Sequence, residues 1–134
     1  EMKTRVSKEV ELNLFGVEEN QEMSIALVNP ALFSWVLENL IRNAVDAMEG
    51  VGVINVVVSQ SGDDVVIDIE DSGKGISRSD MRDVFSPGFT TKNRGWGLGL
   101  SLVKRIVEDY HGGRITLLKS EVGVGTTFRI KLSA

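Results

Sequence analysis

The segment PALFSWVLENLIRNAVDAM, residues 30–48, has the clearest periodicity in the chain. Its apolar side chains recur every three to four residues, so an α-helix would gather them on one face. Asn29 and Pro30 come in the order typical of an N-cap residue followed by proline in the first helical turn. The segment therefore predicts one long helix whose apolar face packs against the rest of the protein. That face consists of Phe33, Val36, Leu37, Leu40, Ile41, Ala44 and Met48.

Shorter segments around this helix alternate apolar and polar residues or are rich in valine, as strands are. A second amphipathic helix is expected over residues 98–110, ended by Gly112 and Gly113, and a helical turn over 79–84. Because helices and strands interleave without regular βαβ order, we predict an α+β fold: a two-layer sandwich with helices packed on one face of a mixed, mostly antiparallel sheet. The expected strands are residues 10–15, 53–59, 65–71, 114–119 and 126–132, with 24–28 as a weaker candidate.

The composition excludes several classes of protein. The chain has 134 residues, of which 42% are hydrophobic and 25% charged, and this suits one domain with a single core. It has no cysteine and one histidine, which excludes disulfide and thiolate metal sites and argues against a multi-histidine one. The net charge of −4 argues against nucleic acid as a partner, and no apolar run approaches the roughly 20 residues of a membrane span. We therefore expect a cytoplasmic domain without direct membrane insertion, compatible with a membrane-anchored parent protein.

A polar strip lies beside the apolar face of the long predicted helix. At about 100° per residue, Asn39, Asn43 and Asp46 fall on this strip. Amide and carboxylate oxygens are ligands that a hydrated magnesium ion prefers, so the strip is a candidate metal and phosphate site. Simple solvent exposure is the alternative, and helix geometry alone favours it.

Ten of the 14 glycines lie between Gly73 and Gly125, in short clusters. The first cluster, Asp71-Ser72-Gly73-Lys74-Gly75, directly follows a predicted strand. Its carboxylate could accept a hydrogen bond from the amino group of a nucleotide base. The main chain of the two glycines, which carries no side chain, could then lie close to the ring of that base. The alternative is a turn in which the aspartate side chain bonds the local main chain.

The second cluster, Gly95-Trp96-Gly97-Leu98-Gly99-Leu100, opens onto the second predicted helix. Free main-chain N–H groups at a helix start favour an anion such as phosphate, and Lys92 and Arg94 lie just upstream. Neither a Walker loop nor a dinucleotide fingerprint fits, because no Gly-Lys-Ser/Thr follows and no strand precedes. A flexible hinge is the alternative.

The order of these motifs resembles that of the ATP-binding catalytic domain of sensor histidine kinases, which belongs to the GHKL superfamily with the Bergerat fold. The resemblance extends from about Ala31 to Leu132. Five motifs of that family occur in the family's order: an N box at 38–44, a first glycine box at 71–75, an F box at 85–92, a second glycine box at 95–100 and a third, small glycine box at 123–128.

The resemblance implies ATP and magnesium as cofactors, and it implies roles for single residues. Asn43 would ligate magnesium, Asn39 would support the phosphates, and Asp71 would read the adenine amino group. Residues 77–96 would form a lid over ATP that is disordered or mobile until nucleotide binds. Asn39, Asn43 and Lys92 are the implied catalytic residues. Among the nucleotide-binding residues, Gly73 and Gly75 would leave room for the adenine ring, Gly97 and Gly99 would contact phosphate, and Thr127 would approach the adenine. The full set of implied nucleotide-binding residues is Asn39, Asn43, Asp46, Asp71, Gly73, Gly75, Ile76, Phe85, Lys92, Gly95, Gly97, Leu98, Gly99, Leu100 and Thr127.

Two departures from the family pattern sharpen these expectations. Asp46 and Ala47 occupy positions where many histidine kinases carry a lysine and an aromatic residue, so more of the phosphate charge rests on magnesium and Lys92. Asn39 stands where the superfamily's ATP hydrolases and its serine kinases place a glutamate that activates water or a hydroxyl. Without that general base, hydrolysis should be slow, while phosphoryl transfer depends mostly on positioning and charge stabilisation.

His111 is the only histidine, and we expect it to end the second helix rather than to accept phosphate. The phosphoacceptor is then expected on a helical dimerisation domain of the same parent protein, outside residues 1–134, which form one catalytic domain. The resemblance implies transfer of the γ-phosphate of ATP to that histidine, no autophosphorylation by the isolated chain, and a response regulator receiver domain as a further partner. A stand-alone serine kinase of the anti-sigma type and a non-catalytic nucleotide-sensing module are the alternatives.

Overall fold

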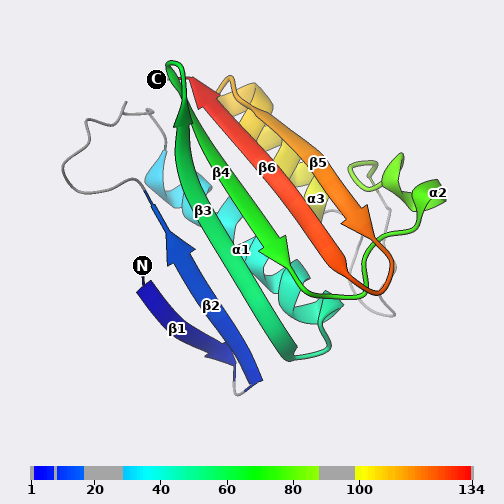
Figure 1. Ribbon diagram of the computed structural model, residues 1–134. Coiled ribbons are helices and arrows are strands. Elements are labelled where there is room, and N and C mark those ends of the chain that lie inside the picture. The colour runs from blue at the N-terminus through cyan, green and yellow to red at the C-terminus, as the bar shows by residue number, and fades with distance from the viewer. Residues whose placement is uncertain (1, 8, 17–28, 88–98, 134) are drawn as a thin grey trace.

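The computed structural model describes residues 2–7, 9–16, 29–87 and 99–133 (Figure 1). The helical elements are α1 (Pro30–Ala47), α2 (Arg78–Met81), α3 (Gly99–Arg105) and a π-helical turn, η1 (Ile106–Tyr110), that continues α3. The strands are β1 (Met2–Ser7), β2 (Glu9–Phe15), β3 (Val51–Ser61), β4 (Asp64–Asp71), β5 (Arg114–Glu121) and β6 (Gly125–Ser133). Within these residues, no helix combines the length and apolarity needed to cross a bilayer.

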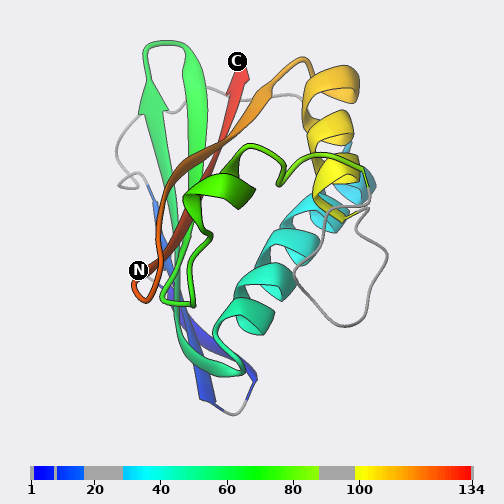
Figure 2. The same cartoon turned by 90° about the vertical axis from the view of Figure 1, so that its right-hand side faces the viewer.

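The elements form two layers, and α1 and α3 cover one face of the sheet (Figure 2). The core lies between the layers, because alternate strand residues such as Ile54, Ile69 and Ile130 turn their side chains toward Val36 and Leu40 of α1. These five side chains are at most 2% exposed. The predicted two-layer α+β architecture is therefore confirmed.

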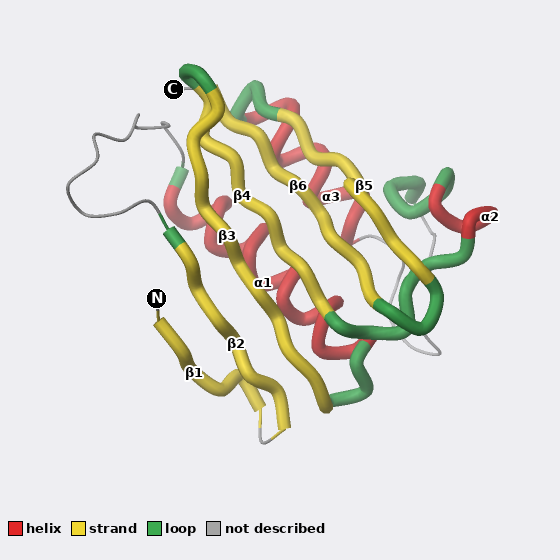
Figure 3. The backbone as a smooth tube through the Cα atoms, viewed as in Figure 1, coloured by secondary structure: helices red, strands yellow, loops and turns green. Residues whose placement is uncertain are grey.

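The sheet is mixed, with the strand order β1-β2-β3-β4-β6-β5 (Figure 3). β2 and β3 are parallel, and all other neighbours are antiparallel. The parallel pair needs a crossover connection, and α1 lies between β2 and β3 in the chain. This topology sets Asp71, at the end of β4, directly opposite Ile54 of β3 and Thr126 of β6.

α1 begins as predicted, because the side chain of Asn29 accepts a hydrogen bond of 3.1 Å from the N–H of Leu32. The second helix differs from the prediction, since its last five residues widen into the π turn η1. β1 was not predicted, because an edge strand needs no buried face and its apolar alternation is weak. The candidate strand at 24–28 lies outside the described residues.

Candidate functional site

Asp71 is the buried acidic residue of the first glycine box. Its side chain is 7% exposed, and its Oδ1 accepts a hydrogen bond of 2.8 Å from the N–H of Gly73. Burial raises the pKa of Asp71, an effect that main-chain N–H groups of Gly73 and Thr126 partly oppose and the nearby Glu70 charge reinforces. A desolvated carboxylate of this kind gains more than an exposed one from a further hydrogen-bond donor.

The two glycines of this loop are required by the protein's own packing. A Cβ atom on Gly73 would lie 2.8 Å from the main chain of Ala47, where α1 ends. Gly75 has a φ of 77°, and a Cβ atom there would collide with the carbonyl oxygen of Glu121. The main-chain N–H of Lys74 also donates to the carbonyl oxygen of Ala47 over 2.9 Å. The loop is therefore fixed to α1 on one side and to the β5–β6 hairpin on the other.

The third glycine box is attached to the first. The N–H of Gly123 donates to the carbonyl oxygen of Lys74 over 2.9 Å, and the N–H of Ile76 donates to Oγ of Ser120 over 2.8 Å. The Ser120 hydroxyl lies 2.7 Å from the hydroxyl of Thr126. These bonds make the end of β4 and the tip of the β5–β6 hairpin one hydrogen-bonded unit.

The polar strip of α1 is half-buried, which differs from the full exposure that helix geometry alone favours. The side-chain amide nitrogen of Asn39 donates to the carbonyl oxygen of Trp35 over 2.8 Å. Its Oδ1 is then directed away from Trp35, and a Cβ atom on Gly99 would lie 3.7 Å from it. The N box therefore faces the start of α3, as a common site with the second glycine box requires.

α1 separates the first glycine box from the second. Its residue Asn39 lies by Gly99, and its last residue, Ala47, lies against Gly73. Eight residues of α-helix separate these two contacts, which corresponds to about 12 Å along the axis. Asn43 and Asp46 are on the same strip between them, so the predicted residues of α1 line the interval from one glycine box to the other.

Several other predicted residues pack against the core. Phe85 packs edge-on against Phe128 with ring centroids 5.9 Å apart, and Nζ of Lys104 lies 5.5 Å from the centroid of the Phe85 ring. Ile76 and Leu100 are half-buried against the same core. Val84 is 2% exposed, so it and Phe85 anchor the first half of the expected lid. The remaining predicted residues, Lys92, Gly95, Gly97 and Leu98, lie outside the described residues.

The structure places Thr127 differently from Thr126, and the expectation that Thr127 approaches the adenine stays a prediction. In β6, Thr126 pairs with Asp71, whereas Thr127 pairs with Glu70. Because successive side chains of a strand point to opposite faces, Thr127 lies on the sheet face away from the helices. Strand alternation counted back from the apolar residues Phe128 and Ile130 would have identified Thr126 as the residue on the Asp71 side.

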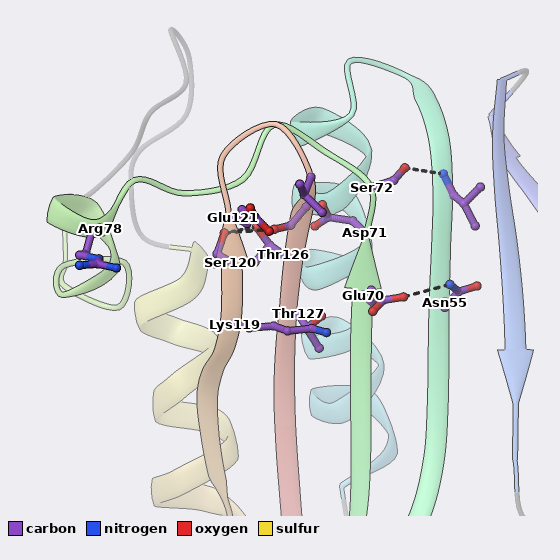
Figure 4. Close-up of a pocket in the computed structure, with 13 residues that line it drawn as sticks. Asn55, Glu70, Asp71, Ser72, Arg78, Lys119, Ser120, Glu121, Thr126 and Thr127 are labelled. Atoms are coloured by element: carbon purple, nitrogen blue, oxygen red, sulfur yellow. Dashed lines mark hydrogen bonds between the residues drawn. The ribbon is translucent and has the colours of Figure 1, made fainter.

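A cavity of about 630 Å³ opens at the ends of β4, β5 and β6 (Figure 4). Glu70 accepts a hydrogen bond of 3.2 Å from Asn55 there, and Lys119 extends across β6 toward Glu70. Asp71 belongs to its wall, but none of the described lining residues comes from α1 or α3. The cavity thus lies among residues of β3, β4, β5 and β6 and their loops, beside Asp71.

Comparison with known proteins agrees with this arrangement. Residues 29–134 match the family model described as histidine kinase-, DNA gyrase B- and HSP90-like ATPase. The sensor histidine kinase ZraS of Escherichia coli K12 is 41% identical over 126 residues, which are 94% of this chain and 26% of ZraS. The nitrogen regulation protein NtrY of Azorhizobium caulinodans is 38% identical over 110 residues, which are 77% of this chain and 14% of NtrY. The chain thus spans about a quarter or less of these relatives' length.

Among solved structures, the catalytic domain of the histidine kinase ThkA has a TM-score of 0.78 and 29% sequence identity. The match covers 92% of this chain and 80% of that one. With the helix-borne amides, the buried aspartate and the first and third glycine boxes in place, the chain belongs to the histidine kinase-, DNA gyrase B- and HSP90-like ATPase family of nucleotide-binding domains.

Proposed function

We propose that this chain is the ATP-binding catalytic domain of a sensor histidine kinase, which transfers the γ-phosphate of ATP to a histidine on a separate helical dimerisation domain. The main support is the placement of the buried Asp71 at one end of the α1 strip and of Gly99 at the other. The similarity to ZraS and NtrY, both named for signalling or regulatory roles, supports the same conclusion.

The Asp71 end of the site would hold the base. An ionised carboxylate only accepts hydrogen bonds, and adenine carries an amino group where guanine carries a carbonyl oxygen. Since burial raises the pKa of Asp71, its ionised form lacks solvation that an amino donor would replace. The site would therefore select ATP over GTP.

The Gly99 end would hold the phosphates. Asn39 presents an oxygen toward this end, and Asn43 lies one helical turn further along the same strip. Oxygen ligands from amides suit magnesium, so we assign Asn43, with Asn39 beside it, to a magnesium ion bound with the nucleotide. When bound, that ion would neutralise phosphate charge, and Lys92 would add a further positive charge.

In the proposed reaction, an imidazole nitrogen of the acceptor attacks the γ-phosphorus, the bond to the β–γ bridging oxygen breaks, and ADP leaves. The chain's own residues position the nucleotide for this step. An imidazole is itself nucleophilic, so the lack of a glutamate at position 39 is no obstacle to it. The asparagine at position 39 argues against the serine-kinase alternative, because a serine hydroxyl would need a general base such as that glutamate.

The test combines binding with transfer. Calorimetry should give binding of magnesium-ATP and magnesium-ADP and far weaker binding of GTP. With radiolabelled ATP, label should appear on the histidine of an added acceptor domain from ZraS. The chain on its own should not become labelled. The label should then pass from the acceptor histidine to an added receiver domain. Label on a serine of a small partner would establish the serine kinase instead. Binding without transfer to any acceptor domain would identify a nucleotide-sensing module.

A further inference from the structure

The only histidine of the chain has both ring nitrogens in hydrogen bonds. The main-chain N–H of Asn29 donates to Nε2 of His111 over 2.9 Å, and Nδ1 lies 2.8 Å from the carbonyl oxygen of Ile106. An N–H can only donate and a carbonyl can only accept. These bonds assign the acceptor role to Nε2 and the donor role, with its proton, to Nδ1.

These two bonds connect the ends of two helices. Asn29 is the N-cap of α1, and Ile106 is the first residue of η1, which continues α3. The ring also packs edge-on against Phe33 in the first turn of α1, with centroids 5.9 Å apart and planes at 75°. His111 thus joins the start of α1 to the end of α3–η1, across 82 residues of sequence.

The joined helices carry the two halves of the proposed site. α1 begins beside His111, and about 15 Å further along its axis Asn39 faces Gly99, the first residue of α3. The helices are therefore antiparallel, tied at one end by the imidazole and facing each other at the other end across the N box and the second glycine box.

We infer that His111 is a positioning residue that sets the spacing between Asn39 and Gly99, through its acceptor bond to Asn29. This role deepens the proposed function and rests on it, because Asn39 and Gly99 matter only if nucleotide binds there. A simple helix stop would need only the bond to Ile106, within its own helix. The two roles therefore depend on different ring nitrogens.

Two substitutions separate the nitrogens. In His111→Gln, the amide oxygen reaches as far as Nε2 and accepts from Asn29. In His111→Asn, the shorter amide reaches only as far as Nδ1 and donates to Ile106. We expect His111→Asn to weaken magnesium-ADP binding about fivefold, the effect of one neutral hydrogen bond, and His111→Gln to restore it. Tyr110→Phe, on an exposed neighbouring residue, is the control and should bind like the unaltered chain.

A second readout needs no nucleotide. The Asn29 amide should exchange slowly with deuterium in the unaltered chain and in His111→Gln, and faster in His111→Asn. Equal ADP affinity or equal Asn29 exchange in the Gln and Asn variants would overturn the inference. So would nitrogen NMR showing the proton on Nε2 of the unaltered chain, which requires no variant to fold. Failure of the unaltered chain to bind ADP would instead refute the proposed function.

Discussion

The main-chain N–H of Gly73 donates 2.8 Å to Oδ1 of Asp71, inside a loop where burial raises the pKa of that carboxyl group. When it is ionised, this group has less solvation than it would have in water. That cost is offset when a ligand supplies a hydrogen-bond donor to the carboxylate.

Asp71→Asn should separate binding from folding. The amide oxygen of the introduced asparagine can still accept the hydrogen bond from the N–H of Gly73. Its NH₂ group would then face the amino group of adenine, and two hydrogen-bond donors cannot pair. We expect magnesium-ADP affinity to fall about 10- to 100-fold, as for loss of a hydrogen bond to a charged group. The unfolding temperature at neutral pH should stay equal or rise, because the desolvated charge is gone. Calorimetry of binding and of unfolding would measure both, and unchanged affinity would remove the adenine-reading role.

The pH dependence of stability follows from the same raised pKa. The Asp71 contribution favours the folded state below the unfolded pKa of about 3.8, and it is lost as pH rises through the higher folded pKa. Relative to Asp71→Asn, the unaltered chain should therefore lose stability as pH rises from the unfolded pKa to the folded pKa of Asp71. Above the folded pKa, the difference in unfolding free energy between the two proteins should stay constant. Thermal unfolding of both proteins over a pH series tests this direction. A rise in the stability of the unaltered chain relative to Asp71→Asn with rising pH would contradict the prediction.

Nucleotide binding should respond to pH in the opposite sense. Protonated Asp71 loses acceptor capacity, so ADP affinity should fall as pH drops through the raised pKa. Asp71→Asn lacks this titration, and its weak binding should be flat over the same range. Competition with a fluorescent ADP analogue would provide the two profiles, and parallel profiles would assign the titration to another group.

Gly75→Ala should destabilise the fold more than Gly62→Ala. Both glycines have positive φ, 77° and 61°, so both substitutions carry the left-handed backbone cost of about 1–2 kcal/mol. Only Gly75 has a neighbour in the way, since nothing lies within 4 Å of a Cβ atom on Gly62. We expect Gly75→Ala to lose about 2 kcal/mol more in chemical denaturation. Equal losses would show that the tip of the β5–β6 hairpin can shift to accommodate the added methyl group without a cost in stability.

Asn43→Ala should reduce the part of nucleotide binding that needs magnesium. We expect ADP affinity with magnesium to drop about tenfold or more, and affinity in chelator to change little. Arg42→Ala, on an exposed neighbour, is the matched control for helix stability. An equal drop with and without magnesium would give Asn43 a role in nucleotide contact alone.

Local patterns predicted much of this molecule. The apolar repeat of residues 30–48 located α1 and its cap at Asn29, and the turn residues around Gly73 and Gly123 located loops that the structure brings together. Relations between distant segments were not accessible in this way. The bond from Asn29 to His111 depends on how two helices pack, and β1 has only a weak edge-strand pattern.

The wide helical turn η1 holds one residue more than ordinary helical winding needs near the end of this helix. A π turn holds one residue more than an α turn, so deleting one residue within 106–110 would restore ordinary winding. The residues after the deletion would then keep nearly their present orientation about the axis, because the residue removed is the extra one that the wide turn holds. The imidazole would stay at the start of α1, and the N–H of Ile115 would stay at the Glu108 carboxylate that accepts it. A single-residue deletion at an exposed position such as Tyr110 should therefore destabilise the domain less than a deletion within α3, where no wide turn holds an extra residue.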